Sequence, residues 1–163
     1  MGQFAYVDSE KLMQKSLAYL DLTKKLDRLL AGHKKELEGP GNELQQRQKK
    51  LTQERDKLSS DAFEQKIKEF QKDYESFRAR TASLKDRYDH FKESGLEQIK
   101  KKMEIVSKNF LTTQKYSAVL DKSAIYMNVD LPDITDQLLD VLNKELPAVV
   151  LEKCKNTEGV CDA

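Results

Sequence analysis

The chain has 163 residues, of which 38% are hydrophobic and 35% are charged, and it contains no tryptophan. So small an apolar share argues against the compact core of an ordinary enzyme, and Ala, Glu, Lys, Leu and Arg together make up about 45% of the residues, as in coiled coils. The net charge of +1 argues against a nucleic-acid binder, because such proteins carry a strong basic excess.

The sequence lacks the signals of a membrane segment or a leader. No apolar run approaches the ~18 residues that a spanning helix needs. The first residues, MGQFAYVDSE, do not have the charged and then apolar layout of a signal peptide. Two interpretations stay open: a cytosolic protein, or a mature secreted chain whose signal peptide has been removed.

The first elements in chain order are a short strand over residues 4–7 and then two long helices. Glycine and proline are scarce in the middle of the chain, which favours uninterrupted helix. The exception is Gly39-Pro40-Gly41, where proline costs a helix interior roughly 3 kcal/mol. We therefore expect a kink or break there that acts as a hinge, and a turn between the helices near residues 58–61.

Heptad spacing predicts that the two helices pack as a coiled-coil hairpin. The second helix carries a mainly aromatic stripe at alternating steps of four and three, with Thr81 in its one polar slot: Phe63, Ile67, Phe70, Tyr74, Phe77, Thr81, Leu84, Tyr88 and Phe91. The first helix offers one leucine per heptad: Leu30, Leu37, Leu44, Leu51 and Leu58. Because that partner seam is thin, we expect the rings of Phe70 and Phe77 to stay partly exposed and available for binding.

The carboxyl-terminal part changes character. Residues 116–120 and 124–127 read as two strands joined as a hairpin by residues 121–123, and an amphipathic helix follows up to Pro147. So few strands leave open edges and little core, which favours oligomerisation through them. The candidate residues of this oligomeric body are Phe4, Tyr6, Val119, Leu120, Ile125 and Tyr126.

The near-zero net charge is a sum of opposed regions. Residues 24–102 hold 21 lysines and arginines against 15 aspartates and glutamates, whereas residues 121–163 hold 4 against 9. Basic side chains gather near the expected turn, where they would attract anionic partners. The candidates for this role are Arg47, Lys49, Lys50, Arg55 and Lys57. An ordinary solvated coiled-coil surface is the alternative interpretation.

Chemistry-bearing motifs are weak. Cys154 and Cys161 show no Cys-x-x-Cys spacing; a local disulfide and two free thiols are both open. The two histidines are isolated, and no glycine-rich phosphate loop occurs. We therefore expect no enzymatic activity, no metal and no cofactor.

The order of strand, helical hairpin, strands and final helix resembles the Skp/OmpH family of periplasmic chaperones. The segments that carry the resemblance are Phe4-Ala5-Tyr6-Val7-Asp8, Leu12-Met13-Gln14-Lys15-Ser16, Tyr116-Ser117-Ala118-Val119-Leu120-Asp121, Ala124-Ile125-Tyr126, Val129-Asp130, and Asp133-Ile134-Thr135 through Leu142-Asn143. The resemblance covers about residues 3–146, with specific ends and a generic coiled coil.

The resemblance implies an α+β fold in which a coiled-coil arm projects from a β-sheet trimerisation body, in a jellyfish-like homotrimer. The discontinuous body would comprise residues 1–20 and 111–146, the arm residues 21–110, and a carboxyl-terminal extension residues 147–163. Further implications are a periplasmic location, ATP-independent holding of unfolded outer-membrane proteins, support of outer-membrane assembly, and contact with lipopolysaccharide or anionic lipid. The basic candidates above rest on charge and do not come from the family.

Three other functions stay open. A nucleic-acid binder would use the basic arms, although the acidic remainder and the net charge of +1 fit it poorly. A prefoldin-like cytosolic chaperone also carries coiled-coil arms on a β body, although its β-hairpins lie between the two helices. A coiled-coil scaffold protein would explain the heptads but not the strand-rich ends.

Overall fold

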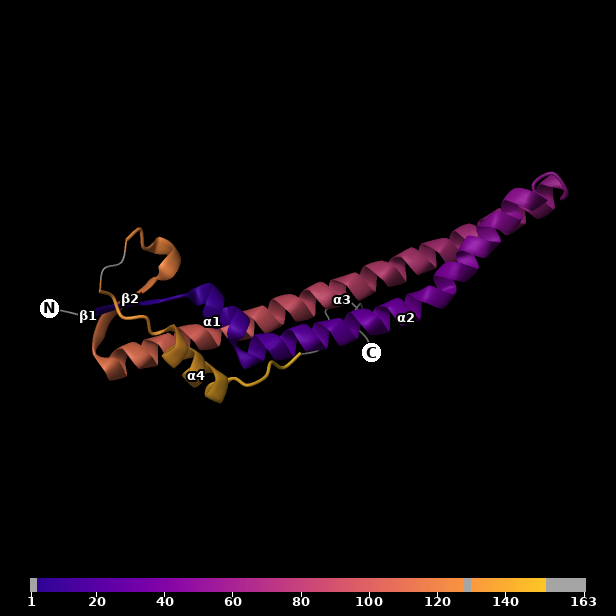
Figure 1. Cartoon of the computed structure of the whole chain (residues 1–163). Helices are drawn as coiled ribbons and strands as arrows, with labels where there is room; N and C mark the ends of the chain where they lie inside the picture. The colour runs from indigo at the N-terminus through magenta and orange to yellow at the C-terminus, as the bar shows by residue number, and fades with distance from the viewer. Residues whose placement is uncertain (1–2, 128–129, 152–163) are drawn as a thin grey trace. The chain divides into compact units, whose positions relative to one another are not determined.

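The computed structural model describes residues 3–127 and 130–151. They form two compact units: a body unit, made of residues 3–26 and 91–151 without 128–129, and a hairpin unit, made of residues 27–90. The elements in chain order are β1 (Gln3–Val7), α1 (Ser9–Lys15), α2 (Leu17–Glu54), α3 (Ser60–Gln114), β2 (Tyr116–Asp121), a short 3-10 turn (Lys122–Ala124) and α4 (Thr135–Glu145) (Figure 1). Helices α2 and α3 contribute to both units, so the body unit takes in more of them than the expected ranges 1–20 and 111–146.

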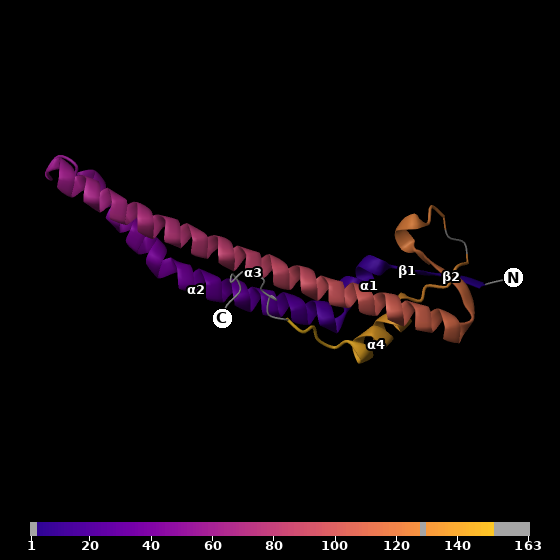
Figure 2. The same cartoon turned by 180° about the vertical axis from the view of Figure 1, so that it is seen from behind.

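The hairpin unit is an antiparallel pair of helices, the carboxyl-terminal part of α2 and the amino-terminal part of α3 (Figures 1 and 2). The chain reverses over residues 55–59. Ser59 begins the second helix, because its carbonyl accepts from the Phe63 amide at 3.0 Å and its hydroxyl accepts from the Ala62 amide at 3.4 Å.

At Gly39-Pro40-Gly41, where a kink or a break was expected, the helix does not break: all three residues lie inside α2. Proline removes one hydrogen bond from the helix, but tertiary packing of the flanking turns overrides this local cost. A Cβ built on Gly41 would lie 3.4 Å from Cζ of Phe77, so the two helices are in contact at this level. The α2 ribbon changes direction in this part of the hairpin unit without ending (Figure 1).

The packed face of α2 differs from the expected leucine repeat at one end. Leu37 and Leu44 are half-buried and Leu51 is buried, but Leu30 is 46% exposed. His33 is buried in its place. The expected seam was therefore wrong at Leu30. Near the start of the hairpin unit, the side chains of α2 that face α3 are those of His33 and, four residues later, Leu37.

In the body unit, β1 is the central strand. It pairs in parallel with β2, in a register that sets Ala5 beside Val119 and Val7 beside Asp121. Its other edge is covered by the segment before α4, because the Tyr6 amide donates to the Pro132 carbonyl and the Ile134 amide to the Tyr6 carbonyl, both at 3.0 Å. Only β2 is left with an unpaired edge among the described strands.

The core of the body unit joins helices to the inner face of this sheet. Its buried members are Ala5, Val7, Leu12, Val106, Ile134, Leu138 and Leu142. The start of α4 is fixed to the start of α1, since the Asp8 amide donates to Thr135 Oγ1 at 2.9 Å while the Asp8 carboxylate accepts from the Lys11 amide. This bond satisfies the buried Thr135 hydroxyl, which in turn donates to Asp133.

The expected β-hairpin after residue 116 was wrong. Only its first strand forms, and it pairs with β1 rather than with residues 124–127. The reason is local: the Asp121 carboxylate accepts from both the amide and the hydroxyl of Ser123, at 2.8 Å and 2.5 Å, and so starts a 3-10 turn.

Helices α2 and α3 approach closely at Gly95 in the body unit. A Cβ added to Gly95 would lie only 2.4 Å from Cδ1 of Leu22, a side chain that is 1% exposed. Glycine normally weakens a helix interior, so its presence here follows from the space that Leu22 takes.

We expect Gly95→Ala to destabilise the protein by about 1–3 kcal/mol, because overpacking outweighs the ~1 kcal/mol that alanine gains in helix propensity. The matched control is Gly32→Ala, since a Cβ at Gly32 meets nothing within 4 Å. That variant should be more stable than the parent chain. Denaturant unfolding followed by circular dichroism measures both, and equal shifts of the same sign would contradict the close approach.

Candidate functional site

The aromatic stripe of α3 in the hairpin unit is only partly covered by α2. Phe70 and Phe77 are half-buried, and Tyr74 is 46% exposed. The rings of Phe70 and Tyr74 stack with centroids 6.1 Å apart, and Phe77 faces Gly41. The hairpin therefore presents ring surface to solvent, as the thin leucine seam predicted.

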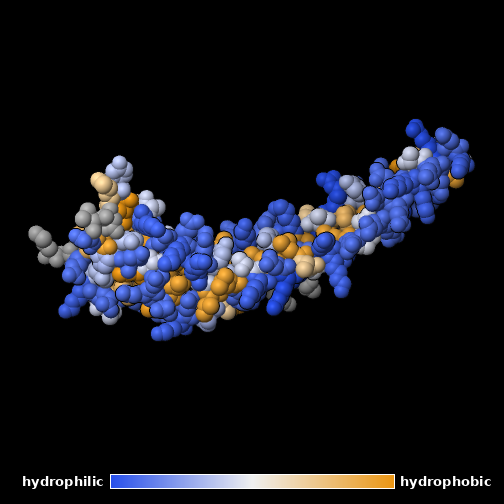
Figure 3. Space-filling model, viewed as in Figure 1, coloured by the Kyte–Doolittle hydropathy of each residue, from blue (hydrophilic) through white to orange (hydrophobic). Residues whose placement is uncertain are grey.

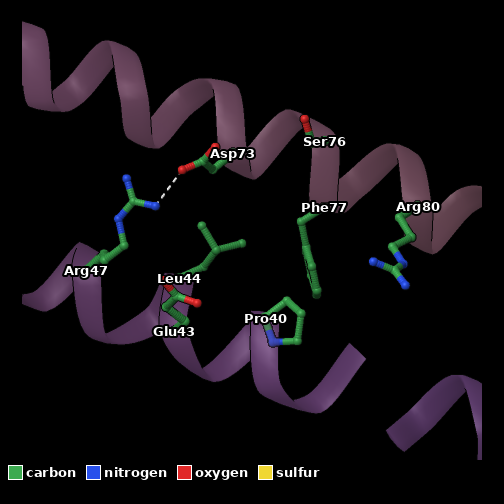
Figure 4. Close-up of a pocket in the computed structure, with 8 residues that line it drawn as sticks. All are labelled: Pro40, Glu43, Leu44, Arg47, Asp73, Ser76, Phe77 and Arg80. Carbon is green, nitrogen blue, oxygen red and sulfur yellow. Dashed lines mark hydrogen bonds and ion pairs between the residues drawn. The ribbon is translucent and has the colours of Figure 1, made fainter. Parts of the chain in front are cut away.

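A shallow hollow lies beside Phe77. Its floor is apolar, formed by Pro40, Leu44 and Phe77, and it has a volume of about 250 Å³. Its sides carry charge: Arg47 donates to Asp73 at 2.5 Å, as Figure 4 shows. Arg80 forms a second ion pair across the helices, with Glu36.

A second hollow, of about 450 Å³, lies nearer the turn between the helices. Its apolar lining consists of Leu51, Phe63, Ile67 and Phe70, and Arg55 stands at its side. Both of these hollows thus place apolar side chains beside at least one arginine.

The five basic candidates differ in their partners. Arg47 is occupied by Asp73, whose hydrogen bond raises the pKa of the guanidinium. Lys49, Lys50, Arg55 and Lys57 are exposed, and within the described residues none of them forms an ion pair. The surface near the turn is strongly hydrophilic on the face that Figure 3 shows. Four cations that form no ion pair among the described residues therefore lie close to the turn, where the carboxylate of Glu54 partly offsets the charge of Lys50 and Lys57.

Comparison with known proteins identifies the family. A family model described as outer membrane protein (OmpH-like) matches residues 3–142. The chain belongs to the OmpH-like family. A crystal structure of a candidate outer membrane chaperone (OmpH-like) from Caulobacter crescentus CB15 has the same fold, with a TM-score of 0.79 and 18% sequence identity over 92% of this chain and 89% of that one. A search of curated proteins found no match.

Membership of the OmpH-like family fits the expectation that the chain has no enzymatic activity. The order of elements also fits: in the OmpH-like chain the strands β1 and β2 flank the two long helices, whereas a prefoldin-like chain would place them between the helices. The described residues contain no group of side chains suited to a metal ion and no helix able to cross a membrane.

The body candidates of the OmpH-like chain fall into two groups. Tyr6, Val119 and Ile125 are half-buried, and Val119 packs against the core. Phe4 is 50% exposed and Leu120 is 40% exposed. Exposure is greatest just after the 3-10 turn, where Tyr126 is 96% and Met127 78% exposed. Cys154 and Cys161 lie outside the described residues.

One feature of the OmpH-like chain was missed by sequence reasoning: the segment 147–151, called the strap below, which binds to Asp21, Lys25 and Gln98. Its sequence shows only that Pro147 ends the helix and that two valines follow. His33 stands at a seam position, where the sequence left a solvated and a seam histidine both open; it is buried, and its Nε2 has no hydrogen-bond partner among the described residues.

His33 makes the stability of the hairpin unit depend on pH. Burial lowers the pKa of His33 below its usual 6.5, and the charge of Arg87 lowers it further. The folded state therefore favours the neutral ring, and the unfolded chain binds the extra proton. Above about pH 6.5 His33 is neutral in both states and does not affect the free energy of unfolding. As the pH falls from 6.5 toward the lower pKa of the folded state, the free energy of unfolding decreases.

We expect His33→Leu to raise the free energy of unfolding by about 1 kcal/mol at neutral pH, because it removes an unsatisfied buried nitrogen from an apolar seam. The gain should grow between pH 6.5 and pH 5. Urea unfolding of both chains at pH 7.5 and pH 5.5 measures this, and an equal difference at the two values would assign the pH dependence to other groups.

Proposed function

We propose that this OmpH-like chain is an ATP-independent holdase of the periplasm, which binds unfolded outer-membrane proteins, prevents their aggregation and supports outer-membrane assembly. The observation that carries this proposal is the combination, on one hairpin unit, of half-covered aromatic rings and four cations without ion pairs. Family membership supports the chaperone role independently.

Holding in this way is passive. Partly exposed Phe70 and Phe77 offer several weak apolar contacts, and the total affinity for a long unfolded chain arises from many such contacts at once. Lys49, Lys50 and Arg55 attract anionic segments over about a Debye length, ~8 Å at physiological salt. The same cations suit the phosphate groups of lipopolysaccharide or anionic lipid.

The body unit is proposed to assemble a homotrimer. The unpaired edge of β2 and the exposed side chains of Phe4, Leu120, Tyr126 and Met127 form an apolar surface on a small unit. Burying that surface between copies removes an open sheet edge, which isolated proteins avoid exposing. Bending at Gly39-Pro40-Gly41, where α2 lacks one hydrogen bond, would adjust the space between the hairpins of the three copies.

The deciding experiment dilutes a urea-unfolded outer-membrane β-barrel protein into buffer with this protein and without ATP. Light scattering should show suppressed aggregation, and scattering combined with size exclusion should give the mass of three chains. A monomer without protective effect would refute the proposal.

Charge should control client affinity. We expect replacement of Lys49, Lys50, Arg55 and Lys57 by glutamine to weaken client binding about thirtyfold at low salt, since each exposed charge contributes up to about 0.5 kcal/mol. The dependence of affinity on salt should also become shallower. The control replaces Lys68 and Lys85, which already form ion pairs with Glu64 and Asp89. An equal loss of client affinity in the control variant would show that the four cations near the turn have no special role.

The aromatic rings are tested separately. Phe70→Ala with Phe77→Ala should shorten client residence by more than any loss of helix content explains, because both part-exposed ring faces are removed. Fluorescence anisotropy of a labelled client measures the release rate, with circular dichroism as the check on folding. Unchanged release from a folded trimer would exclude these rings as client contacts.

A further inference from the structure

The strap lies beyond the residues that the family model matches, which end at 142. It follows α4, which ends at Glu145, and Pro147 prevents the helix from continuing. From there the chain runs along the body unit beside the start of α2 (Figure 1).

Side-chain burial along the strap alternates as in an extended peptide on a surface. Val149 is only 2% exposed, while its neighbour Val150 is 66% exposed, and Ala148 on the other side is exposed too. The strap therefore inserts one apolar side chain into the body unit and leaves its neighbours in solvent.

The main chain of the strap is bound by side chains from both long helices. On the α2 side, the Val149 amide donates to Asp21 Oδ2 at 3.0 Å, and the Val149 carbonyl accepts from Lys25 Nζ at 2.6 Å. On the α3 side, the Val150 amide donates to Gln98 Oε1 at 3.0 Å, and the Val150 carbonyl accepts from Gln98 Nε2 at 2.6 Å. Both polar groups of two successive residues are satisfied in this way.

The groups that bind the strap are held in place by the helices. Asp21 and Lys25 lie one turn apart on the same face of α2 and pair with each other at 2.7 Å. Hydrogen bonds to Lys25 and to the Val149 amide lower the pKa of Asp21 against the opposing effect of burial, so its carboxylate stays charged. Leu22, the residue after Asp21, packs against Gly95 of α3, and this contact brings the two helices close together.

These four hydrogen bonds do not depend on the side chains of the strap, because all four are made to its backbone amides and carbonyls. Recognition of this kind resembles the addition of a peptide strand to a sheet, where main-chain bonds give affinity and a single pocket gives selectivity. A segment that served only to cover apolar surface would not need a donor and an acceptor for each peptide group.

We propose that Asp21, Lys25 and Gln98 form a binding site for an extended polypeptide with one small apolar residue, and that the strap is its internal occupant. The proposal rests on the proposed function, because an unfolded client supplies many such segments. A tethered occupant acts at a high effective concentration, so a single foreign segment displaces it poorly, whereas a long client presents repeated competitors.

The test uses the full chain and a fluorescent peptide with the sequence of residues 146–151, LPAVVL. Val149→Asp places a carboxylate in a buried position beside Asp21 and should expel the strap while leaving the binding side chains intact. We expect about tenfold tighter peptide binding, measured by anisotropy, because removal of an internal competitor raises the binding-competent fraction. The matched control, Ala148→Asp, adds the same charge one residue away on the exposed side and should not change peptide affinity.

A second substitution identifies the site. Adding Gln98→Ala to Val149→Asp should abolish the gain, and circular dichroism checks that each variant is folded. If Val149→Asp unfolds the protein, Val149→Gly releases the strap more gently and is measured in the same way. A folded variant without gain, or a gain that survives Gln98→Ala, overturns the proposal.

Failure of this site and failure of the proposed function are distinguishable. Peptide binding in the anisotropy assay without suppression of client aggregation would refute the holdase while leaving the site in place. Suppression of aggregation by a chain that never binds the peptide would refute the site alone.

Discussion

The structure depends on the parallel pairing of β1 with β2. Val7 pairs with Asp121, although both long helices lie between these two residues in the sequence. This long-range pairing forms the sheet of the body unit. Parallel strands need a long crossover connection, which is usually one helix of about a dozen residues. Here the connection is the complete helical hairpin, so the body core forms only when α2 and α3 have returned the chain to its start. Ile134 and Thr135 then cover the other edge of β1 and fix α4.

Two kinds of surface result from this division of the chain. The body unit buries its apolar residues around Leu12, Val106 and Leu138, and it leaves one edge of β2 unpaired and side chains such as Tyr126 exposed. The hairpin unit has a thin seam between charged surfaces, so rings such as Phe70 are covered on one side only. A low apolar share is therefore compatible with the proposed client binding, which would need only weak contacts spread along the helices.

Sequence reasoning predicted what local patterns determine. The heptads of the second helix and the scarcity of breakers gave both long helices, and the terminal segments gave the family. The errors lie where tertiary contacts override local preference: residues 124–127 form no strand because Asp121 binds Ser123 and β1 takes the place of the expected partner. At Pro40, where a kink or a break was expected, the helix continues. The strap could not be predicted, since its bonds to Asp21 and Lys25 join residues more than 120 positions apart.

The crossover through the hairpin also bears on how such chains diverge. Closing a longer connection between β1 and β2 costs only ~0.6 kcal/mol for each doubling of its length. Matched insertions or deletions of about seven residues in both helices would keep the seam in register. The length of the hairpin can therefore change in whole heptads while the sheet, its register and the hydrogen bonds between Gln98 and the strap stay as they are.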